Sequence, residues 1–349
     1  MTPAVPVAIE KLRQLQPGQV LRLEPMEGLP PSKHRWKQEE IDAAILALAA
    51  RRPLLVRGEP GTGKTQLAHA LASALGWALH GATIHARFEA QDLLYQFDAV
   101  RRLSDAQACK LREPGWDEKQ YWQPGPLWKA FGWETTEGYG AGREWVGGET
   151  VAGGEAVAPA GHVVLIDEID KADSDLPNSL LEVLGSRRLI IPPLAEPLVA
   201  SEARWPLIVI TTNEERELPA AFIRRCVVLT HDLPTGPAYA DFLVEHGRTH
   251  FGPDQAEAGQ AMHEDTLREA AAQLLQDRDQ TVAAHLPPPG LAEYLDLLRA
   301  LQELAPGNPK VQSEWLGKLN RYAYLKHRVE GEGAKALRQN RPNLGESAA

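Results

Sequence analysis

Short apolar runs and longer amphipathic stretches alternate from about residue 37 to residue 234. The apolar runs cover residues 54–56, 82–86, 163–166, 207–210 and 227–229, and loop or helical signals separate each run from the next. A run this short is typical of a strand that is buried on both faces of a parallel sheet. The alternation of such strands with helices predicts an α/β fold with a parallel sheet.

Two amphipathic helices flank the first of these strands. Residues 37–52 place apolar side chains at helical spacing with acids near the start, and the pattern stops before Pro53. Residues 67–75 repeat leucine at the same spacing and are followed by Gly76, a common residue just past a helix end. We therefore predict a helix, a strand, a glycine-rich loop and a second helix, in this order.

The strand signal disappears after Pro234. Helical patterns then cover residues 239–246, 264–276, 291–304 and 311–329. These changes in pattern predict four parts along the chain. The parts are an N-terminal extension (1–36), an α/β domain (37–234) with a glycine-rich insert at about 132–161, a helical domain (235–330) and a flexible tail (331–349).

Charge and composition narrow the class of partner. The net charge of -10 and the pI of about 5.6 disfavour nucleic acid as the chief partner, because proteins that bind polyanions are usually basic. The chain has no run approaching the roughly 18 apolar residues of a membrane helix and no apolar signal-peptide block at its start, so we expect a cytoplasmic protein without a membrane partner. Cys109 and Cys226, the only cysteines, are too few for a disulfide scaffold or a zinc cluster.

A glycine-rich loop joins the first predicted strand to the helix that follows. It has the pattern of a phosphate-binding loop and consists of Gly58, Glu59, Pro60, Gly61, Thr62, Gly63, Lys64 and Thr65. The glycines allow backbone N–H groups to point at phosphates, and the helix N-terminus adds the positive end of its dipole. Lys64 is placed to reach the β- and γ-phosphates and the Thr65 hydroxyl to ligate magnesium. The loop therefore predicts a site for a nucleoside triphosphate with Mg²⁺.

Two acids follow the third predicted strand directly. The carboxyl end of a buried strand is the place where open α/β sheets bind their ligands. Asp167 fits an acid that orients magnesium and its water shell, and Glu168 fits a base that polarises the attacking water. The alternative is a pair of solvated acids at an ordinary strand end. With the glycine-rich loop upstream, the pair predicts hydrolysis of the γ-phosphate.

Further candidates lie near the ends of the last two strands. Asn213 follows the fourth strand, where a neutral amide can hold the lytic water, although asparagine is also common in plain turns. Arg224 and Arg225 precede the fifth strand. A guanidinium suits the charge that develops on a transferring phosphoryl group, and it can be supplied by a neighbouring subunit.

These motifs resemble the AAA+ ATPases and, more narrowly, the MoxR-type branch. The matching segments are GEPGTGKT, EAQDLLYQFDAVRRL, GPLWKAF, VVLIDEIDKAD followed by LPNSLLEVLGSRRLIIP, and PLIVITTNEERELPAAFIRRCVVL. Together they extend from about Lys37 to Pro234, which is more than half of the chain.

The resemblance implies an AAA+ P-loop fold with the sheet order 5-1-4-3-2, a C-terminal helical lid, and a homo-oligomeric ring that we expect to be a hexamer. It places ATP and Mg²⁺ at the subunit interfaces. By position it assigns the Walker A loop to Gly58–Thr65, the Walker B pair to Asp167 and Glu168, sensor 1 to Asn213, and the finger that acts on a neighbour to Arg224 or Arg225.

One family feature lacks a counterpart. The sensor 2 arginine belongs near the start of the third lid helix, but residues 289–295 contain no arginine. Arg299 lies two turns later, where packing or a surface position are the alternatives.

The function that the resemblance implies is ATP-driven remodelling, maturation or activation of a protein client, with a separate von Willebrand A domain protein as one possible partner. An alternative is a nucleotide-dependent assembly switch or scaffold with slow hydrolysis. A DNA-directed motor is a third and weaker hypothesis, because the chain is acidic.

Other residues receive a structural or a tentative role. We expect His80 and His85 to be structural histidines, since no cysteine or paired carboxylate stands at metal spacing, and we expect no metal beyond nucleotide-bound Mg²⁺. The glycine-rich insert contains Tyr139 and Trp145. One hypothesis places these aromatic residues on a mobile loop that lines a pore or grips a client, and the alternative is a disordered surface insertion.

Overall fold

The computed structural model describes residues 4–26, 29–112, 115–140, 158–173, 175–199, 201–253, 261–283, 286 and 288–323. The chain divides into two compact units. The first unit comprises Met1–Gly58 and Gly63–His231, and the second comprises Glu59–Thr62 and Asp232–Ala349.

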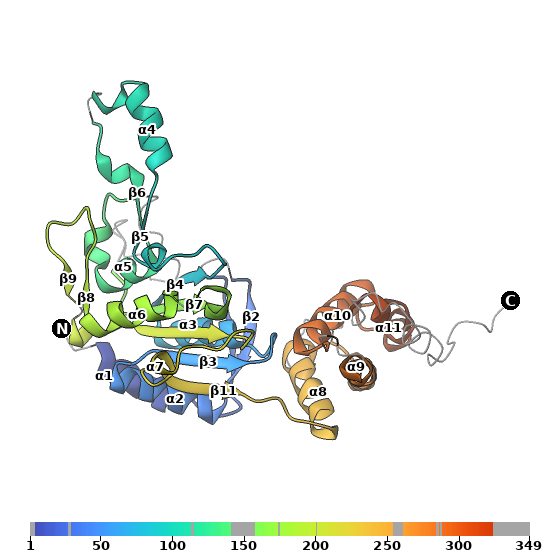
Figure 1. The fold of residues 1–349 in the computed structure, drawn as a ribbon. Helices are drawn as coiled ribbons and strands as arrows, with labels where there is room; N and C mark the ends of the chain where they lie inside the picture. Colours follow the sequence, from blue (N-terminus) through green and yellow to red (C-terminus); the bar gives the residue numbers. More distant parts are fainter. Residues whose placement is uncertain are drawn as a thin grey trace, which may run out of the picture. The chain divides into compact units, whose positions relative to one another are not determined.

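A five-stranded parallel sheet forms the centre of the first unit (Figure 1). Its strands are β3 (Leu54–Gly58), β4 (Ala78–Thr83), β7 (His162–Asp167), β10 (Leu207–Thr212) and β11 (Val227–His231). They lie in the order β11-β3-β10-β7-β4, and all neighbouring pairs are parallel. This order confirms the 5-1-4-3-2 arrangement and the α/β fold. The carboxyl ends of β3, β7 and β10 therefore meet at one edge of the sheet.

The second predicted strand was placed too late. The sequence pattern favoured residues 82–86, whereas β4 runs from Ala78 to Thr83 and pairs with β7 from Ala78 opposite His162. The strand contains His80 and Gly81, which interrupt the apolar pattern, although His80 is buried. The first residue of this strand is set by its pairing with β7. A local run of apolar residues does not reveal where that pairing begins.

The segment between β4 and β7 contains several short elements, and part of it forms an arm, whereas α5 (Pro126–Phe131) packs on the sheet. Figure 1 shows α4 at the end of this arm, away from the sheet. Tyr95 and Phe97 lie on a short strand that pairs antiparallel with residues 122–124, with Phe97 opposite Trp122. The elements are η1 (Ala90–Leu93), β5 (Tyr95–Phe97), α4 (Ala99–Gln107), η2 (Lys110–Arg112), η3 (Glu118–Tyr121), β6 (Trp122–Pro124), α5 (Pro126–Phe131) and η4 (Trp133–Thr136).

Several short elements complete the first unit. They are β1 (Val20–Leu23), β2 (Ser32–Arg35), η5 (Ile169–Lys171), α6 (Asp175–Ser186), β8 (Arg188–Leu189), β9 (Leu198–Val199), η6 (Glu202–Arg204) and α7 (Ala220–Ile223).

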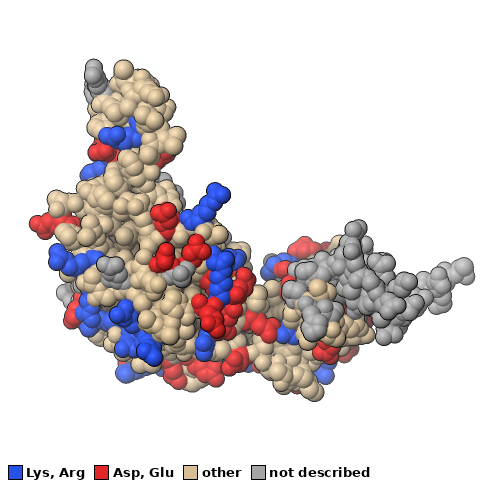
Figure 2. All heavy atoms as spheres, in the orientation of Figure 1, with Lys and Arg blue, Asp and Glu red and all other residues tan. Residues whose placement is uncertain are grey.

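On the face that Figure 2 shows, the basic side chains of the described residues are interspersed with acidic ones.

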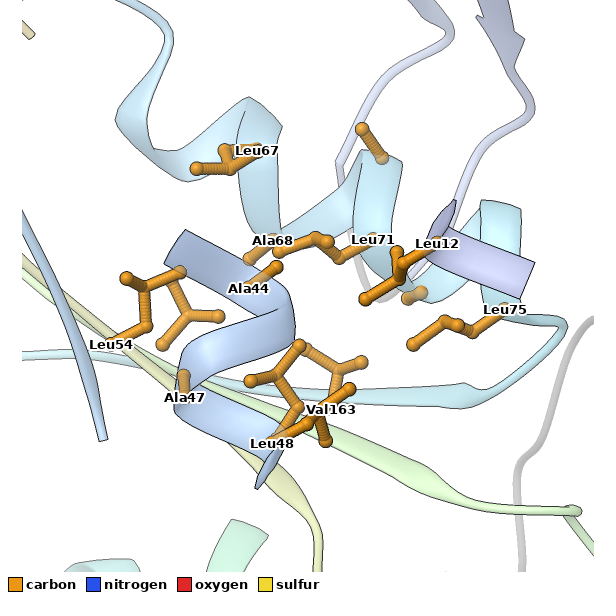
Figure 3. Packing of buried hydrophobic residues seen from close by; sticks show 14 of the residues in the cluster. Leu12, Ala44, Ala47, Leu48, Leu54, Leu67, Ala68, Leu71, Leu75 and Val163 are labelled. Carbon is orange, nitrogen blue, oxygen red and sulfur yellow. The ribbon is translucent and has the colours of Figure 1, made fainter. Parts of the chain in front are cut away.

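Alternate residues of each strand point into separate cores on the two faces of the sheet. Leu54 and Val163 belong to a core with helices α1 (Ala4–Arg13), α2 (Gln38–Ala50) and α3 (Lys64–Leu75), and Figure 3 shows leucines of all three helices meeting there. Their successors Leu55 and Val164 belong to the core on the other face.

The N-terminal extension contributes to the first of these cores. Val5, Ala8 and Leu12 of α1 are buried, and full burial of a leucine stabilises the fold by about 1.5–3 kcal/mol. The sequence pattern did not predict this helix, because a helix of 10 residues depends on tertiary packing more than on its own propensity.

The described residues of the second unit after residue 232 form four helices, at positions that the helical patterns predicted. Tyr294 is fully buried at their centre, and its hydroxyl donates to the carbonyl of Leu267 over 3.0 Å. The helices are α8 (Pro237–Phe251), α9 (Glu264–Ala283), α10 (Leu291–Leu304) and α11 (Pro309–Ala323). Among the residues whose structure is described, no helix is both long enough and apolar enough to span a membrane.

Candidate nucleotide-binding site

The glycine-rich loop begins at the last residue of β3 and ends at the first turn of α3. At the α3 end, the Lys64 side chain turns back and its Nζ donates to the carbonyl of Gly58 over 2.8 Å. Burial lowers the pKa of the Lys64 ammonium, and nearby carboxylates, Asp167 first, act in the opposite direction. The geometry therefore holds a lysine cation inside the loop, where it can face the phosphates of a nucleotide.

Gly58 is required at its position by both conformation and space. Its φ of +148° lies in a region that favours glycine, and a Cβ at this residue would lie 2.7 Å from the carbonyl oxygen of His231. His231 is the register partner of Gly58 on the neighbouring strand β11. Its ring lies 3.3 Å from the buried carboxylate of Glu40, which also contacts His34. A buried ionisable cluster thus supports the strand next to the start of the loop.

The middle of the loop, Glu59–Thr62, belongs to the second unit. Within that unit, Arg278 Nη2 lies 2.8 Å from both carboxylate oxygens of Glu59, and a Cβ on Gly61 would lie 2.8 Å from the Cβ of Ala292. Arg299 instead pairs with Asp296 on the surface of α10. Of the two alternatives for Arg299, the structure shows the surface position.

Thr65 and Asp167 are neighbours although 102 residues separate them. The Thr65 hydroxyl lies 2.9 Å from Asp167 Oδ1 and 3.1 Å from Oδ2. Thr65 is in the first turn of α3, and Asp167 is the last residue of β7. Magnesium in nucleotide sites takes one or two such protein oxygens beside phosphate and water. The two residues therefore fit a magnesium site next to the loop.

Glu168 follows Asp167 with an unusual backbone conformation. Its φ is 60°, which is uncommon for a residue other than glycine and is seen at functional sites. The Asn213 side chain donates to Glu168 Oε1 over 3.3 Å, and Lys171 contacts Oε2. The structure therefore brings together Asp167 and Glu168, the residues predicted as the Walker B pair, and Asn213, the residue predicted as sensor 1.

Two residues of this site were missed in the sequence. Thr211 lies on β10 beside Asp167, and its hydroxyl contacts that carboxylate over 2.6 Å. Asp170 is buried, and its Oδ2 accepts from the backbone N–H groups of Asn213 and Glu215 over 3.2 and 3.0 Å. A polar residue at the carboxyl end of a strand beside the acid pair was the available signal for Thr211.

Arg224 and Arg225 follow helix α7 and are exposed. Within the described residues, neither guanidinium has a hydrogen bond or ion pair with another side chain, and neither contacts Asp167 or Glu168. In a single chain these arginines therefore stand apart from the acid pair.

The two histidines near β4 differ in their surroundings. His80 is buried and shares a 3.0 Å hydrogen bond with His162, and both rings lie beside Trp133. Burial, with a smaller contribution from His80, lowers the pKa of His162 to about 3. His85 is exposed. The described part of the chain contains no cluster of three metal-ligating side chains.

The hypothesis of a mobile aromatic loop is wrong for Tyr139. This side chain is only 5% exposed, packs against Trp128 at 5.0 Å, and donates its hydroxyl to the carbonyl of Pro193 over 3.3 Å. Burial against a neighbouring tryptophan gives the ring a role in packing. Trp145 lies outside the described residues.

Comparison with known proteins places this site in a family. The AAA domain of the dynein-related subfamily matches residues 53–226, about half of the chain, including the loop and the acid pair. No curated protein matches the sequence. The crystal structure of a protein named "putative ATPase" from Cytophaga hutchinsonii is 13% identical over 96% of this chain and 91% of that one, with a TM-score of 0.39, a likeness too weak to support an argument. The family match and the five-stranded sheet with its loop show that the chain belongs to the AAA+ ATPases.

Proposed function

We propose that the loop Gly58–Thr65 binds the phosphates of ATP and that Asp167 and Glu168 direct hydrolysis at the γ-phosphate. The observation that supports this proposal best is the contact of Thr65, in the first turn of α3, with Asp167, the last residue of β7 directly before Glu168. Bound Mg²⁺ would neutralise phosphate charge, held by the Thr65 hydroxyl and the Asp167 carboxylate.

Each of the remaining side chains of the site has a separate role in hydrolysis. Lys64 provides positive charge against the β- and γ-phosphates. Glu168 accepts a proton from the attacking water, and Asn213 fixes the carboxylate that does so, because its amide already donates to Glu168. Thr211 holds the Asp167 carboxylate through a hydrogen bond from its hydroxyl to Oδ1.

We further propose that the active site is completed by a second copy of the chain in a ring. Arg224 and Arg225 are exposed and have no side-chain partner among the described residues, as expected for a finger that acts on a neighbouring subunit. A guanidinium supplied across a subunit interface would stabilise charge on the transferring phosphoryl group. Hydrolysis in one subunit would then depend on the position of the next.

The biological output that we favour is remodelling or activation of a protein client, as in MoxR-type members of the family. The net charge of -10 and the mixed surface charge support a protein partner over nucleic acid. Under this proposal, one client is a separate protein that contains a von Willebrand A domain. The second candidate is an assembly switch, which the same site could also serve if turnover is slow.

The proposal is tested by the mass of the purified protein in solution with ATP and magnesium, measured by light scattering. The Glu168→Gln variant should form a multi-subunit assembly with ATP, and Lys64→Ala should not, because it lacks the charge that binds the phosphates. A single-subunit mass for wild type and Glu168→Gln alike would contradict the ring. Stimulation of phosphate release by a client favours remodelling, and a stoichiometric burst followed by a stable assembly favours the switch.

A further inference from the structure

Lys171 contacts the proposed base, Glu168, but has no part in the proposed function. It is the last residue of η5, three positions after Glu168. Its backbone N–H donates to the carbonyl of Glu168 over 3.0 Å, and its Nζ contacts Glu168 Oε2. Both side chains are partly exposed, so the contact can break without unfolding the turn.

Buried residues and backbone hydrogen bonds hold the turn that carries Lys171 in place. The two residues between Glu168 and Lys171, Ile169 and Asp170, are buried, and Asp170 accepts two backbone hydrogen bonds from the segment after β10. The backbone position of Lys171 is therefore anchored, while its side chain lies at the surface next to the proposed base.

Both oxygens of Glu168 are engaged in this arrangement. Oε1 accepts from the Asn213 amide over 3.3 Å, and Oε2 is paired with Lys171. A general base must present an oxygen within hydrogen-bond distance of the water that it deprotonates. The Lys171 ammonium occupies acceptor capacity of Oε2 and holds the carboxylate in its present orientation, so it restricts how the attacking water can approach that oxygen.

The surroundings keep Lys171 charged. Pairing with Glu168 raises the pKa of Lys171, and the carboxylates of Glu215 and Asp170 act in the same direction. The ammonium is therefore protonated at any neutral assay pH. The carboxylates of Glu168, Glu215 and Asp170 are the charged groups that act on it.

We propose that Lys171 is a positioning residue that holds Glu168 in a resting geometry and lowers the rate of the hydrolytic step until the pair opens. This inference rests on the proposed role of Glu168 as the base. The competing view is that an exposed pair three residues apart has no measurable effect, as is common for surface ion pairs.

The test is single-turnover ATP hydrolysis by the full-length chain, with enzyme in excess over ATP and magnesium present. Lys171→Met removes the charge but keeps the length, and it should raise the hydrolytic rate about two- to fivefold while the half-saturating ATP concentration stays unchanged. Lys171→Arg restores the pairing and should behave as wild type. The matched control is Arg216→Met, which removes a charge paired with Asp173 on the same face and should leave the rate unchanged.

The outcomes separate this inference from the proposed function. An unchanged or lower rate in Lys171→Met, or an equal rise in Arg216→Met, overturns the role of Lys171. Wild-type turnover by Glu168→Gln overturns the role of Glu168 as the base instead. If Glu168→Gln is inactive, the rise in Lys171→Met should disappear in the double variant Lys171→Met/Glu168→Gln. Persistence of the rise in that double variant would contradict an action through Glu168.

Discussion

The Thr211 hydroxyl lies 2.6 Å from Asp167 Oδ1 and also accepts from the backbone N–H of Glu168 over 2.9 Å. One buried side chain of β10 thus contacts both members of the acid pair, Asp167 at the end of β7 and Glu168 directly after it. The two strands are paired neighbours in the sheet, and Thr211 is fully buried between them and the rest of the core.

Removing this hydroxyl should impair turnover. Thr211→Val keeps the shape of the side chain but loses a hydrogen bond to a charged group, which is worth about 1.5–3 kcal/mol, so kcat should fall roughly 10- to 100-fold. Steady-state measurements of phosphate release determine this change in kcat. Thr212→Val is the control, because the Thr212 hydroxyl contacts only the backbone of Glu214 among the described residues. An equal kcat for Thr211→Val and wild type would show that Thr211 does not position the acids.

The two exposed arginines make a prediction about subunit mixtures. Arg224→Ala and Arg225→Ala should lower turnover with little loss of ATP binding, because a finger acts on the transition state of a neighbour. Mixing either variant with Glu168→Gln should restore part of the activity, since some interfaces then combine an intact base with an intact finger. Inactive mixtures at every ratio would contradict a donated arginine.

His162 predicts a pH dependence of stability. Its pKa is about 3 in the folded chain because of burial, against an ordinary value near 6.5. Below pH 6.5 the unfolded chain therefore binds a proton that the folded chain excludes until about pH 3, and stability is lost as the pH falls through this window.

The variant His162→Phe removes this dependence and keeps an aromatic ring beside Trp133. Between pH 7 and pH 5 the wild type should lose about 2 kcal/mol more unfolding free energy than His162→Phe, measured by urea denaturation. His85→Phe is the matched control at an exposed histidine and should lose as much as wild type. Parallel losses in wild type and His162→Phe would show that His162 does not stay neutral in the fold.

Much of the fold follows from local patterns in the sequence. The strands at β3, β7, β10 and β11 and the four C-terminal helices lie where apolar runs and helical spacing placed them. The glycine-rich loop was predictable because its conformational demands are local, as Gly58 shows. Residues 78–81 were not predicted as part of a strand, because His80 and Gly81 interrupt the apolar pattern. The limits of this strand are set by its pairing with β7.

The candidate site was predictable to the extent that its residues end strands or form a motif. Asp167, Glu168 and Asn213 come together because parallel strands end at one edge of the sheet. The contacts of Thr211 and Lys171 depend on register and on the geometry of one turn, and no periodicity encodes these features. Tyr139 was misjudged because its burial depends on Trp128, a tertiary contact.

The central claim is that Glu168 activates water for attack on ATP bound in the loop Gly58–Thr65. The most direct measurement compares ATP binding and phosphate release for wild type, Glu168→Gln and the control Glu217→Gln, which alters an exposed acid of the segment after β10. Glu168→Gln should bind ATP about as tightly as wild type and hydrolyse it at least about 100-fold more slowly, with Glu217→Gln unchanged. Hydrolysis by Glu168→Gln at the wild-type rate would contradict the account.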